Sequence, residues 1–566
     1  MYEWKTLPWR KLERSIFKLQ KRIYRASLRG DVKTVRRLQR LMMKSWSVKC
    51  LAVRRVTQDN QGKKTAGVDG VKSLTPKQRL ELVQKLRLSQ KAKPTRRVWI
   101  PKPGTEEKRP LGIPTMTDRA LQALVKLALE PEWEAKFEPN SFGFRPGRSC
   151  QDAIVQIFLD IRFKPKFVLD ADISKCFDRI NHKALLEKLQ TSPTLHRQIR
   201  AWLKAGVMDG KQLFPTSEGT PQGGVLSPLL ANIALHGLEN EIKQVVKKGR
   251  DTQKELSLIR YADDFVVLHK DLSVVQRCQQ VIVEWLKGMS LELKPSKTQI
   301  THTLNEYEGK TGFDFLGFTI RQFPVGKYVT GKNTHGEPLG FATIITPSKE
   351  KLKQHIEQVG QTVRKLSAVT QSELIGCLNP IIRGWANYYA CACSRDAYEG
   401  ANHYIYQQLR SWAYRRHPNK SRDWIFRKYW RTIGNSTWTF ASKESGQLKQ
   451  LFKHTDTPIV RHTKVQGNRS PYDGDWVYWG SRLGKHPEVP TRLTTLLKRQ
   501  KGKCNWCKLY FKDGDLMETD HKDPSKPKGE RGKLENLQVL HRHCHDTKTA
   551  LDKTMLESLS DNVLSH

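Results

Sequence analysis

Two adjacent carboxylates, Asp263 and Asp264, lie inside the apolar stretch RYADDFVVL at residues 260–268. Because Asp is common at turns, the pair could simply form the tip of a hairpin between two strands. The flanking residues are nevertheless apolar enough to form buried strands, and buried like charges are costly unless a cation neutralises them. The stretch therefore predicts a metal site, with a plain hairpin tip as the alternative.

A second carboxylate pair is a candidate partner for the first. A site that binds two divalent ions needs carboxylates from separate chain segments, because one segment cannot surround both ions. In the stretch KFVLDADISKCFDRI, three apolar residues lead directly into Asp170 and Asp172. Phe177 follows about one helical turn after the second carboxylate, where its ring could close the space beside a sugar 2′ position. The two stretches together indicate phosphoryl-transfer chemistry.

A third cluster lies near the C-terminus, where Cys504 and Cys507 of CNWC are followed by His541 and Cys544 of HRHC. Two ligand pairs of this kind are typical of a tetrahedral structural Zn²⁺ site, and a small module with little core would be stabilised by the ion. His543 is the alternative fourth ligand. The other seven cysteines are scattered without a pattern, and we interpret them as ordinary thiols in a reducing compartment.

The whole chain is long and strongly basic. Its 566 residues exceed what one hydrophobic core supports, so several domains are expected. Lys and Arg number 100 against 56 Asp and Glu, which gives a net charge of +44 and favours a nucleic acid as the partner. No stretch resembles a membrane span and the start of the chain has no apolar signal region, so neither a membrane partner nor secretion is expected.

Hydrophobic periodicity in the first half of the chain predicts the elements that position these groups. Two helices broken near Gly30 are expected between residues 11 and 56. A further helix is expected over 71–90, with Pro76 in its first turn. Alternating apolar runs and helical stretches over 95–320 are typical of an α+β enzyme core.

The second half of the chain has a different pattern. The Gly-rich stretch 323–340 predicts a hairpin or an exposed loop. Helical spacing returns over 348–416, followed by a looser segment rich in Trp, Lys and Arg that closes with GSRLGKHPEVP, which we interpret as a linker. A last module begins near Thr491.

Seven stretches resemble, in the same order, the successive blocks of the reverse transcriptases encoded by mobile group II introns, which also act as maturases. A single YADD would be weak evidence because four residues recur by chance, whereas seven ordered blocks leave little room for chance. The blocks are RPLGIPTMTDRALQ (109–122), SFGFRPGRSCQDA (141–153), DADISKCFDRI (170–180), GTPQGGVLSPLLANIAL (219–235), RYADDFVVL (260–268), LELKPSKTQI (291–300) and FDFLGFTI (313–320).

The resemblance implies a polymerase site that binds two Mg²⁺ ions. Asp172 and Asp263 correspond to the metal-binding aspartates of the polymerase palm, with Asp264 beside them as a third catalytic carboxylate. Asp170 does not correspond to the ligand, because the family places the ligand five residues before an aromatic residue, which here is Phe177. Phe177 corresponds to the steric gate that disfavours ribonucleotides.

The resemblance also implies residues that bind the incoming nucleotide. Gln222 would line the dNTP, while Lys102 and Arg109 would hold its triphosphate. Lys297 would either donate a proton to pyrophosphate or belong to a capping turn with solvated lysines. These two roles of Lys297 stay open.

Contacts with RNA are implied for two regions. Arg145 and Arg148 would contact template phosphates, with a turn that carries surface arginines as the alternative. The stretch GCLNPIIRGWANYYACACS resembles the family's thumb, or maturase domain, where basic and aromatic side chains grip structured intron RNA. Arg383, Trp385 and Tyr388 are the candidate RNA-binding residues, although aromatics at helical spacing are usually core residues.

The C-terminal module resembles an HNH, or ββα-metal, nuclease. His521 would be the general base that activates water, and Asp520 and His545 would hold one divalent ion such as Mg²⁺. Asn536 would orient the base, and Glu518 would be a supporting ligand. A structural zinc ribbon with incidental histidines is the alternative.

The fold class expected from the resemblance is an α+β multidomain protein with a right-hand polymerase, an α-helical thumb, a basic DNA-binding segment and a small zinc-stapled ββα domain. The expected domains are residues 1–95 for an N-terminal extension and the start of the fingers, 96–322 for the reverse transcriptase fingers and palm, 323–416 for the thumb or maturase domain, 417–490 for the DNA-binding region and linker, and 491–566 for the HNH endonuclease.

The expected function combines RNA-directed DNA polymerisation, assistance to splicing, and DNA cleavage for target-primed reverse transcription in intron mobility. The expected partners are intron RNA in a ribonucleoprotein, target DNA, an RNA template with a DNA primer, and dNTPs. A non-enzymatic RNA chaperone would predict eroded aspartates, whereas Asp172 and the YADD pair are intact. A nuclease that merely binds DNA would leave the seven blocks unexplained. The expected location is the cytoplasm or nucleoid of a prokaryote, or an organelle, and a dimer is one option for an oligomeric state that the sequence leaves open.

Overall fold

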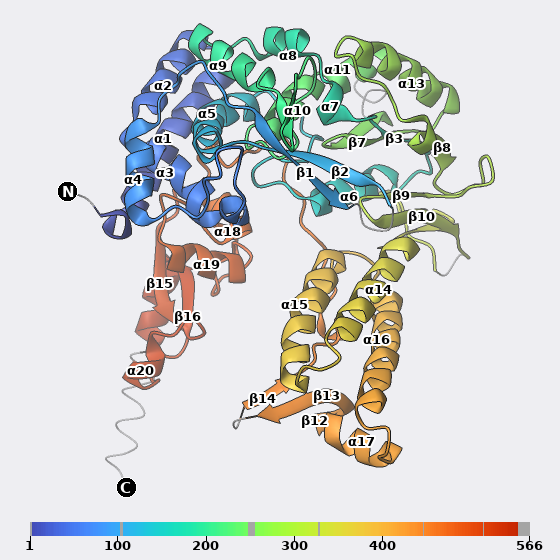
Figure 1. Cartoon of the computed structure of the whole chain (residues 1–566). Coiled ribbons are helices and arrows are strands. Elements are labelled where there is room, and N and C mark those ends of the chain that lie inside the picture. The colour runs from blue at the N-terminus through green and yellow to red at the C-terminus, as the bar shows by residue number, and fades with distance from the viewer. Residues whose placement is uncertain are drawn as a thin grey trace.

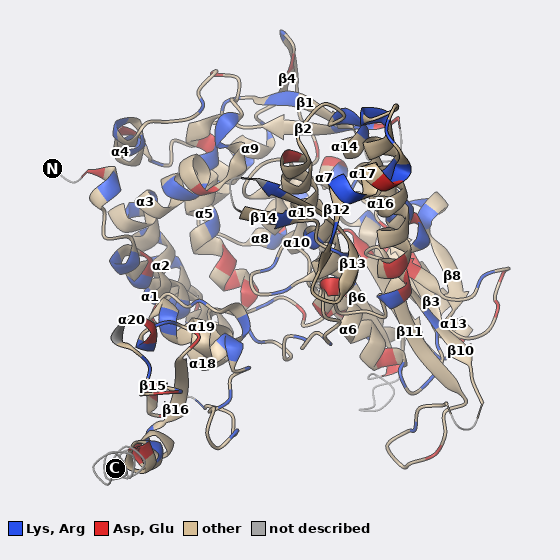
Figure 2. Ribbon diagram, turned by 90° about the horizontal axis from the view of Figure 1, so that it is seen from below, with Lys and Arg blue, Asp and Glu red and all other residues tan. Residues whose placement is uncertain are grey.

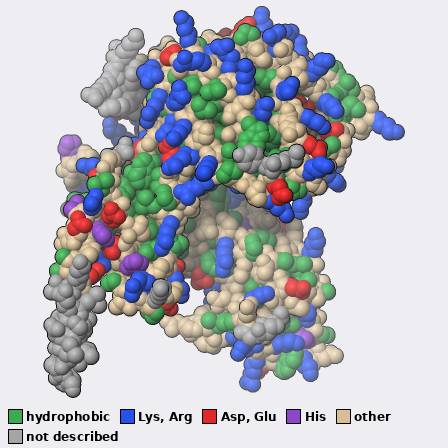
Figure 3. All heavy atoms as spheres, turned by 90° about the vertical axis from the view of Figure 1, so that its left-hand side faces the viewer, with side chains coloured by type: hydrophobic (Ala, Val, Ile, Leu, Met, Phe, Trp, Pro, Cys, Tyr) green, Lys and Arg blue, Asp and Glu red, His purple; other side chains and the backbone are tan. Residues whose placement is uncertain are grey.

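The computed structural model describes residues 3–101, 106–246, 255–326, 329–444, 447–512 and 514–552, which form a mixed α/β protein of several domains (Figure 1). Lys and Arg are spread from the N-terminal helices to the C-terminal unit in the ribbon of Figure 2 and over much of the face shown in Figure 3, in agreement with the net charge of +44. Among the described residues, no helix combines the length and apolar character that a membrane crossing requires.

The N-terminal layer is helical. The predicted break at Gly30 is confirmed, because Gly30 has φ +70° and Asp31 caps the next helix by accepting a hydrogen bond from the Thr34 N–H. The expected helix pair is nevertheless three helices, since the chain becomes extended again at Ser45. These helices pack on α5, which is buried along nearly its whole length. The layer consists of α1 (Trp9–Leu28), α2 (Val32–Lys44), α3 (Trp46–Arg54), α4 (Pro76–Lys85) and α5 (Met116–Glu134).

A first four-stranded sheet has the order β2-β1-β4-β5 and projects from these helices. Its long hairpin pairs Arg96 with Ile113 at one end and Pro101 with Lys108 at the other. The tip of that hairpin, residues 102–105, is outside the described residues. The strands are β1 (Thr95–Pro101), β2 (Lys108–Ile113), β4 (Val207–Asp209) and β5 (Gln212–Phe214).

The central sheet has the order β6-β7-β3-β8, and its two faces belong to different cores. Successive side chains of a strand point to opposite faces, so Val266 packs towards α6 while Phe265 and Val267 pack towards α13. Helices therefore cover both faces, and only the strand ends can present polar groups. The elements are β3 (Phe167–Asp172), β6 (Ser257–Tyr261), β7 (Asp264–His269), β8 (Gln299–His302), α6 (Cys150–Ile161) and α13 (Leu272–Lys287).

Shorter elements connect these sheets. The helices are α7 (Cys176–Arg179), α8 (His182–Leu189), α9 (Pro193–Leu203), α10 (Ser227–Leu235) and α11 (Leu238–Ile242). The short helical turns are η1 (Trp4–Thr6), η2 (Arg55–Asp59), η3 (Gln61–Lys64), η4 (Lys243–Val245), η5 (Pro295–Lys297) and η6 (His454–Asp456).

A three-stranded sheet, β11-β10-β9, leads into a helical unit. The helices and the strands that follow them share one core, which includes Leu378, Trp412 and Phe440. Much of the region predicted as a separate DNA-binding segment therefore packs on the helices. The elements are β9 (Phe313–Phe315), β10 (Phe318–Pro324), β11 (Phe341–Pro347), α14 (Lys349–Lys365), α15 (Gln371–Tyr389), α16 (Arg395–Arg416), α17 (Arg422–Tyr429), β12 (Trp430–Ile433), β13 (Ser436–Glu444) and β14 (Gln447–Gln450).

The chain then returns to α6 and the N-terminal helices before it enters the C-terminal unit. This returning segment, residues 462–490, includes the predicted linker and is anchored rather than free: Arg482 contacts Asp152 of α6 at 2.6 Å, and Glu488 pairs with Lys21 of α1 at 2.6 Å. In Figure 1 the C-terminal unit accordingly lies below the N-terminal helices, away from the helical unit. Its elements are α18 (Trp476–Leu483), α19 (Thr491–Arg499), β15 (Met517–His521), α20 (Lys528–Arg531) and β16 (Leu537–His541).

Candidate functional site

The adjacent carboxylates Asp263 and Asp264 lie at a hairpin tip. Tyr261 pairs with Asp264, so Ala262 and Asp263 form a two-residue turn, and Ala262 has φ +61°. The hairpin tip and the carboxylate cluster are therefore one feature and not alternatives. Asp172, the last residue of β3, lies opposite Asp264 in the sheet register. Three carboxylates thus meet at one edge of the central sheet.

The electrostatics of this cluster fit a bound cation. Burial, together with the charges of Asp263 and Asp172, raises the pKa of Asp264 to about 7. Burial also raises the pKa of Asp263, with a smaller contribution from Asp172. The Lys297 ammonium lies 2.9 Å from an Asp172 carboxylate oxygen, although its side chain is 57% exposed and belongs to the short turn η5, so both predicted roles of Lys297 stay open. A divalent ion bound here would relieve the repulsion that the protein alone leaves in place.

Asp170 lies next to this cluster, two residues before Asp172 on the same face of β3, and its charge adds to the rise in the pKa of Asp264. It pairs with Val266 in the register and accepts a hydrogen bond from Gln299 at 3.4 Å, whereas Asp172 pairs with Asp264. Burial raises the pKa of Asp170 to about 6. Its position supports the choice of Asp172 over Asp170 as the ligand.

A buried cation beneath the hairpin tip was not assigned a role from the sequence. Arg260 is 1% exposed, and its Nη1 donates to the Ala262 carbonyl at 3.1 Å and to the Asn232 amide oxygen at 3.2 Å. Asn232 in turn donates to the Gly143 carbonyl, and a Cβ at Gly143 would lie 2.3 Å from the Ala262 nitrogen. These contacts fix the turn that carries Asp263. The signal in the sequence is an arginine inside an otherwise apolar strand.

The candidate nucleotide-binding residues surround the same edge. Phe177 lies on α7, five residues after Asp172, and its ring meets Phe144 edge-on, with 6.1 Å between ring centroids. Gln222 donates to both carboxylate oxygens of Asp178 at 3.2 Å, so the residue after the candidate steric gate holds Gln222 in place. Sequence reasoning did not single out Asp178.

Cations from the first hairpin reach this region. Arg109 is exposed on β2, and its charge lowers the pKa of Asp263 and Asp178, opposing the larger effect of burial. Arg97 on β1 likewise lowers the pKa of Asp178, although no motif in the sequence singled out this residue. Lys102 lies outside the described residues.

The position of Arg145 contradicts its predicted contact with the template. Its guanidinium forms a two-pronged pair with Glu134 at 2.9 and 3.0 Å, and both side chains are 1% exposed. It also donates to the carbonyls of Glu138 and Ser141. Arg148 likewise donates to backbone carbonyls, including that of Pro139 at 2.6 Å. Both arginines are used inside the protein because the loop that carries them is buried against α5 and the returning segment.

The candidate RNA-binding residues of α15 divide into two groups. Arg383 is exposed and lies 4.9 Å from the centroid of the Phe452 ring, so its charge remains available. The Tyr388 hydroxyl donates to the Leu316 carbonyl and its ring stacks on Phe318, which is a core position. Trp385 stacks on His355 at 4.7 Å. The core alternative therefore holds for Tyr388 and for the stacked face of Trp385.

The C-terminal unit contains a metal-ligand cluster. One ligand atom from each of four side chains lies within 4.8 Å of all the others, and the four residues are Cys504, Cys507, His541 and Cys544. His541 ends strand β16, whereas His543 is exposed on the following helical turn. The Nε2 of His541 lies 3.4 Å from Asp515, the arrangement that orients a metal-ligating imidazole. This Cys/His group could hold a metal ion, with His541 as its fourth member.

The candidate nuclease residues lie on the same unit. Asp520 faces His545, with 3.9 Å between the nearest oxygen and nitrogen, and it accepts a hydrogen bond from Gln538. Lys548, which sequence reasoning missed, lies 3.2 Å from Asp520. Glu518 is exposed one pleat earlier on β15. Asp520 and His545 are therefore placed to share one cation.

The segment that carries the candidate base is fixed by Asn536. Its side-chain oxygen accepts from the Asp523 N–H at 3.1 Å, and its amide donates to the Asp523 carbonyl at 2.9 Å. The His521 ring makes no hydrogen bond to any described residue, which leaves its nitrogens accessible to a water molecule. Asn536 thus orients the strand end that bears His521 rather than the ring itself.

Four family models match successive parts of the chain. They are the N-terminal domain of reverse transcriptase over residues 4–86, reverse transcriptase (RNA-dependent DNA polymerase) over 100–320, the group II intron maturase-specific domain over 351–430, and HNH endonuclease over 504–551. The last three matched ranges contain the carboxylate cluster, the helical unit and the Cys/His cluster, respectively.

Curated relatives share these regions. The group II intron-encoded protein LtrA of Lactococcus lactis subsp. cremoris is 32% identical over 374 residues, which are 53% of this chain and 61% of LtrA. Protein YkfC of Escherichia coli K12 is 32% identical over 327 residues, 50% of this chain and 83% of YkfC. Maturase-like protein 1 of Euglena gracilis is 34% identical over 398 residues, 67% of this chain and 76% of that protein. The matched part is thus about three fifths of the length of LtrA.

A carboxylate cluster at the edge of a four-stranded sheet, flanked by cations from a neighbouring hairpin, defines the class of nucleic-acid polymerases. Within that class, the matches to reverse transcriptase, maturase and HNH models identify the lineage. The chain belongs to the group II intron-encoded proteins, as the resemblance predicted.

Proposed function

We propose that this chain is a multifunctional intron-encoded enzyme: an RNA-directed DNA polymerase, a maturase that binds intron RNA, and an HNH DNA endonuclease that together serve intron mobility by target-primed reverse transcription. The observation that carries the proposal is the register that brings Asp172, Asp263 and Asp264 to one sheet edge. Its partners are intron RNA, target DNA, an RNA template with a DNA primer, and dNTPs, in the cytoplasm or nucleoid of a prokaryote or in an organelle.

The finer architecture is part of this proposal. Residues 1–95 form an N-terminal extension and the start of the fingers, 96–322 the fingers and palm of a right-hand polymerase, 323–416 the thumb, 417–490 a DNA-binding region and linker, and 491–566 a ββα nuclease. The packing of β12 to β14 on the thumb helices extends the thumb's core into the DNA-binding region. That continuity favours joint handling of RNA and DNA by one surface.

At the polymerase site, Asp172 and Asp263 hold two Mg²⁺ ions, with Asp264 as the third carboxylate. Bound Mg²⁺ supplies activation of the primer 3′-hydroxyl and charge neutralisation at the leaving pyrophosphate. Arg109 and Lys102 bind the triphosphate, and Phe177 excludes a 2′-hydroxyl. Lys297, an ion partner of Asp172, would be the group that donates a proton to pyrophosphate.

At the nuclease site, Asp520 and His545 hold one divalent ion and His521 accepts the proton of the attacking water. Cys504, Cys507, His541 and Cys544 hold Zn²⁺, a donor set of three thiolates and one imidazole that suits this ion. When bound, Zn²⁺ would tie His541 at the end of β16 and Cys544 to the CNWC loop, next to His545.

Primer extension tests the polymerase. Purified wild-type protein should extend a DNA primer on an RNA template with dNTPs and Mg²⁺, and Asp263→Asn should abolish extension while intron splicing persists. Asp170→Asn is the matched control, because it removes a nearby buried carboxylate outside the cluster. The polymerase assignment fails if folded wild-type protein does not extend, and the ligand choice fails if Asp170→Asn is the inactive variant.

Strand nicking tests the nuclease separately. His521→Ala should lose second-strand cleavage of target DNA and keep primer extension. His543→Ala, on the exposed face of the same unit, is the control. Full nicking by His521→Ala would rule out His521 as the base.

A further inference from the structure

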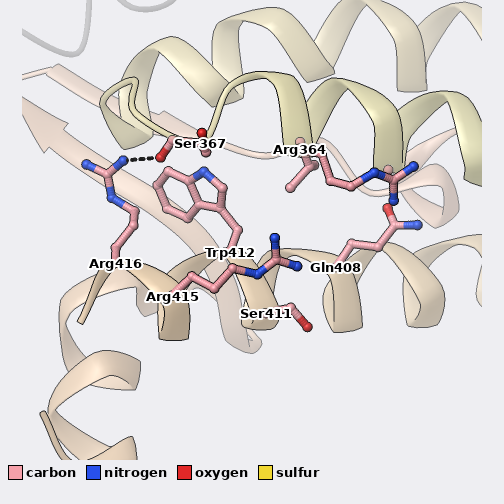
Figure 4. Close-up of a pocket in the computed structure, with 9 residues that line it drawn as sticks. Arg364, Ser367, Gln408, Ser411, Trp412, Arg415 and Arg416 are labelled. Atoms are coloured by element: carbon pink, nitrogen blue, oxygen red, sulfur yellow. Dashed lines mark hydrogen bonds between the residues drawn. The ribbon is translucent and has the colours of Figure 1, made fainter. Parts of the chain in front are cut away.

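A cavity of about 340 Å³ lies between α14 and α16 of the helical unit (Figure 4). Its volume is in the range of small-ligand sites. The lining contains three arginines and a tryptophan but no Asp or Glu. The residues that matter here are Arg364, Gln408, Trp412, Arg415 and Arg416. A site so lined is suited to an anion that carries a flat ring.

The arginines supply charge in two different settings. Arg415 is exposed and forms no ion pair or hydrogen bond with the described residues, and Arg364 is in the same situation. Arg416 is held in place, because its Nη1 donates to the Ser367 carbonyl at 2.6 Å and its guanidinium lies 4.6 Å from the Trp412 ring centroid. Figure 4 shows this planar group beside the indole. Two cations are therefore free for a phosphate and one forms a stacking surface.

Gln408 contributes an unsatisfied acceptor. Its Oε1 is buried and accepts no hydrogen bond from the described residues, while its Nε2 donates to the Ile356 carbonyl. A buried acceptor without a partner is costly, and a ligand N–H would relieve that cost. Gly360 makes room for the amide, because a Cβ at this helical position would lie 2.9 Å from Nε2. The glycine in the middle of α14 thus has a local purpose despite its low helix propensity.

The position of the cavity separates it from the polymerase site. Trp412, at its floor, packs against Tyr429 of α17 and Phe440 of β13. In Figure 1 these elements lie at the end of the helical unit that points away from the central sheet. An occupant of the cavity is therefore not the nucleotide that reacts beside Asp263.

We propose that this cavity binds a single unstacked nucleotide of the intron RNA. Arg364 and Arg415 contact its phosphate, its base stacks on the Arg416 guanidinium, and a base N–H donates to Gln408 Oε1. Sequence-specific recognition of RNA relies on such splayed-out nucleotides, which stack on aromatic or guanidinium planes. The inference rests on the proposed binding of intron RNA by this unit, and it assigns to Gln408 a direct part in base selection.

The test compares variants of the full-length protein for equilibrium binding to a transcript of the intron that surrounds its reading frame. Arg415→Gln and Gln408→Leu should each weaken binding by about 5- to 10-fold, the value of one charge-assisted or buried hydrogen bond. Arg410→Gln is the matched control, since it removes one exposed charge from the same helix outside the cavity, and it should weaken binding less than about 2-fold. Probing of 2′-hydroxyl reactivity should find one nucleotide that is protected by wild type and Arg410→Gln but exposed with the other two variants.

Distinct outcomes overturn distinct claims. Equal weakening by Arg410→Gln and Arg415→Gln, or no effect of Gln408→Leu, would show general charge attraction and refute the nucleotide pocket. Saturable binding of free AMP or GMP that is lost in Arg415→Gln, without any effect of this variant on the transcript, would assign the cavity to a free nucleotide instead. If wild type binds the transcript no better than an unrelated RNA of equal length, the proposed maturase function itself fails.

Discussion

The buried pair of Glu134 and Arg145 allows a direct test between two roles of Arg145, a structural ion pair and a contact with template phosphates. Replacing Glu134 by Gln would leave the Arg145 charge buried without its partner, since both side chains are 1% exposed and the two contacts measure 2.9 and 3.0 Å. Breaking such a pair costs about 3–5 kcal/mol. Arg145→Met should cost at least as much, because it also leaves two backbone carbonyls without their donor.

The assay is thermal melting of the full-length protein combined with binding of an RNA template at two salt concentrations. Glu134→Gln and Arg145→Met should both lower the melting temperature by several degrees, and the double substitution Glu134→Leu with Arg145→Met should recover only the part of the loss that comes from the unpaired charge, since the two carbonyls still lack their donor. Glu399→Gln is the control, because its pair with Arg395 is exposed and should contribute less than about 1 kcal/mol. A template contact predicts the opposite: Arg145→Met would weaken template binding and its salt dependence at unchanged stability, and Glu134→Gln would do nothing.

Three further perturbations follow from the same contacts. Arg260→Met should lower kcat for primer extension by roughly 10- to 100-fold with template affinity unchanged, because the turn that carries Asp263 loses its buried hydrogen-bond donor. Arg260→Lys should restore part of the rate. Equal activity of wild type and both variants would show that the turn is stable without Arg260. Burial opposes ionisation of Glu138, but its hydrogen bond with His236 holds the pKa of Glu138 at about 2, below the ordinary 4.5. The ionised carboxylate therefore contributes roughly 3 kcal/mol to the free energy of unfolding. This contribution is complete above about pH 4.5 and is lost as the pH falls towards 2. Melting temperatures between pH 6 and 3 should therefore fall more steeply for wild type than for Glu138→Gln, and parallel curves would contradict the shift. Removal of zinc by a chelator, or Cys504→Ser, should make the C-terminal unit sensitive to limited proteolysis. Cys377→Ser, which changes an exposed lone thiol, is the control and should leave the unit resistant. A resistant metal-free unit would mean that its apolar core keeps it folded without the ion.

The sheet edge that carries the three carboxylates was largely predictable from the sequence because the signals for it are local. Apolar runs on both sides of Asp263 and before Asp172 set the strands, and strands of matched length bring their ends together. The sequence could not show that the turn needs a support, since Arg260 meets Asn232 only through tertiary packing across 28 residues. Of the two sequence interpretations of the Asp pair, the turn is confirmed, and the metal site stays a prediction.

Residues whose roles depend on distant partners were predicted poorly. Arg145 looks like a surface cation in a Gly- and Pro-containing loop, and nothing nearby in the chain reveals that Glu134 at the end of α5 faces it. Spacing alone likewise allowed His541 or His543 as the fourth ligand. Only the end of strand β16 at His541, which turns the next residues outward, decides between them.

The returning segment shows why a Gly- and Pro-rich stretch need not be a flexible linker. Asp152 of α6 is fully buried, yet it accepts hydrogen bonds from Arg482, from His462 and from the Val465 N–H, all more than 300 residues away in the sequence. Gly147 lies so close to this segment that a Cβ would come within 2.5 Å of the Trp479 ring. The helix that supports the catalytic sheet thus also holds the approach to the C-terminal unit. The contacts of Asp152 therefore hold the C-terminal unit against the helix that covers the central sheet. On the proposed function, we expect the target DNA to move between the nuclease site and the polymerase site, while the nuclease stays in place.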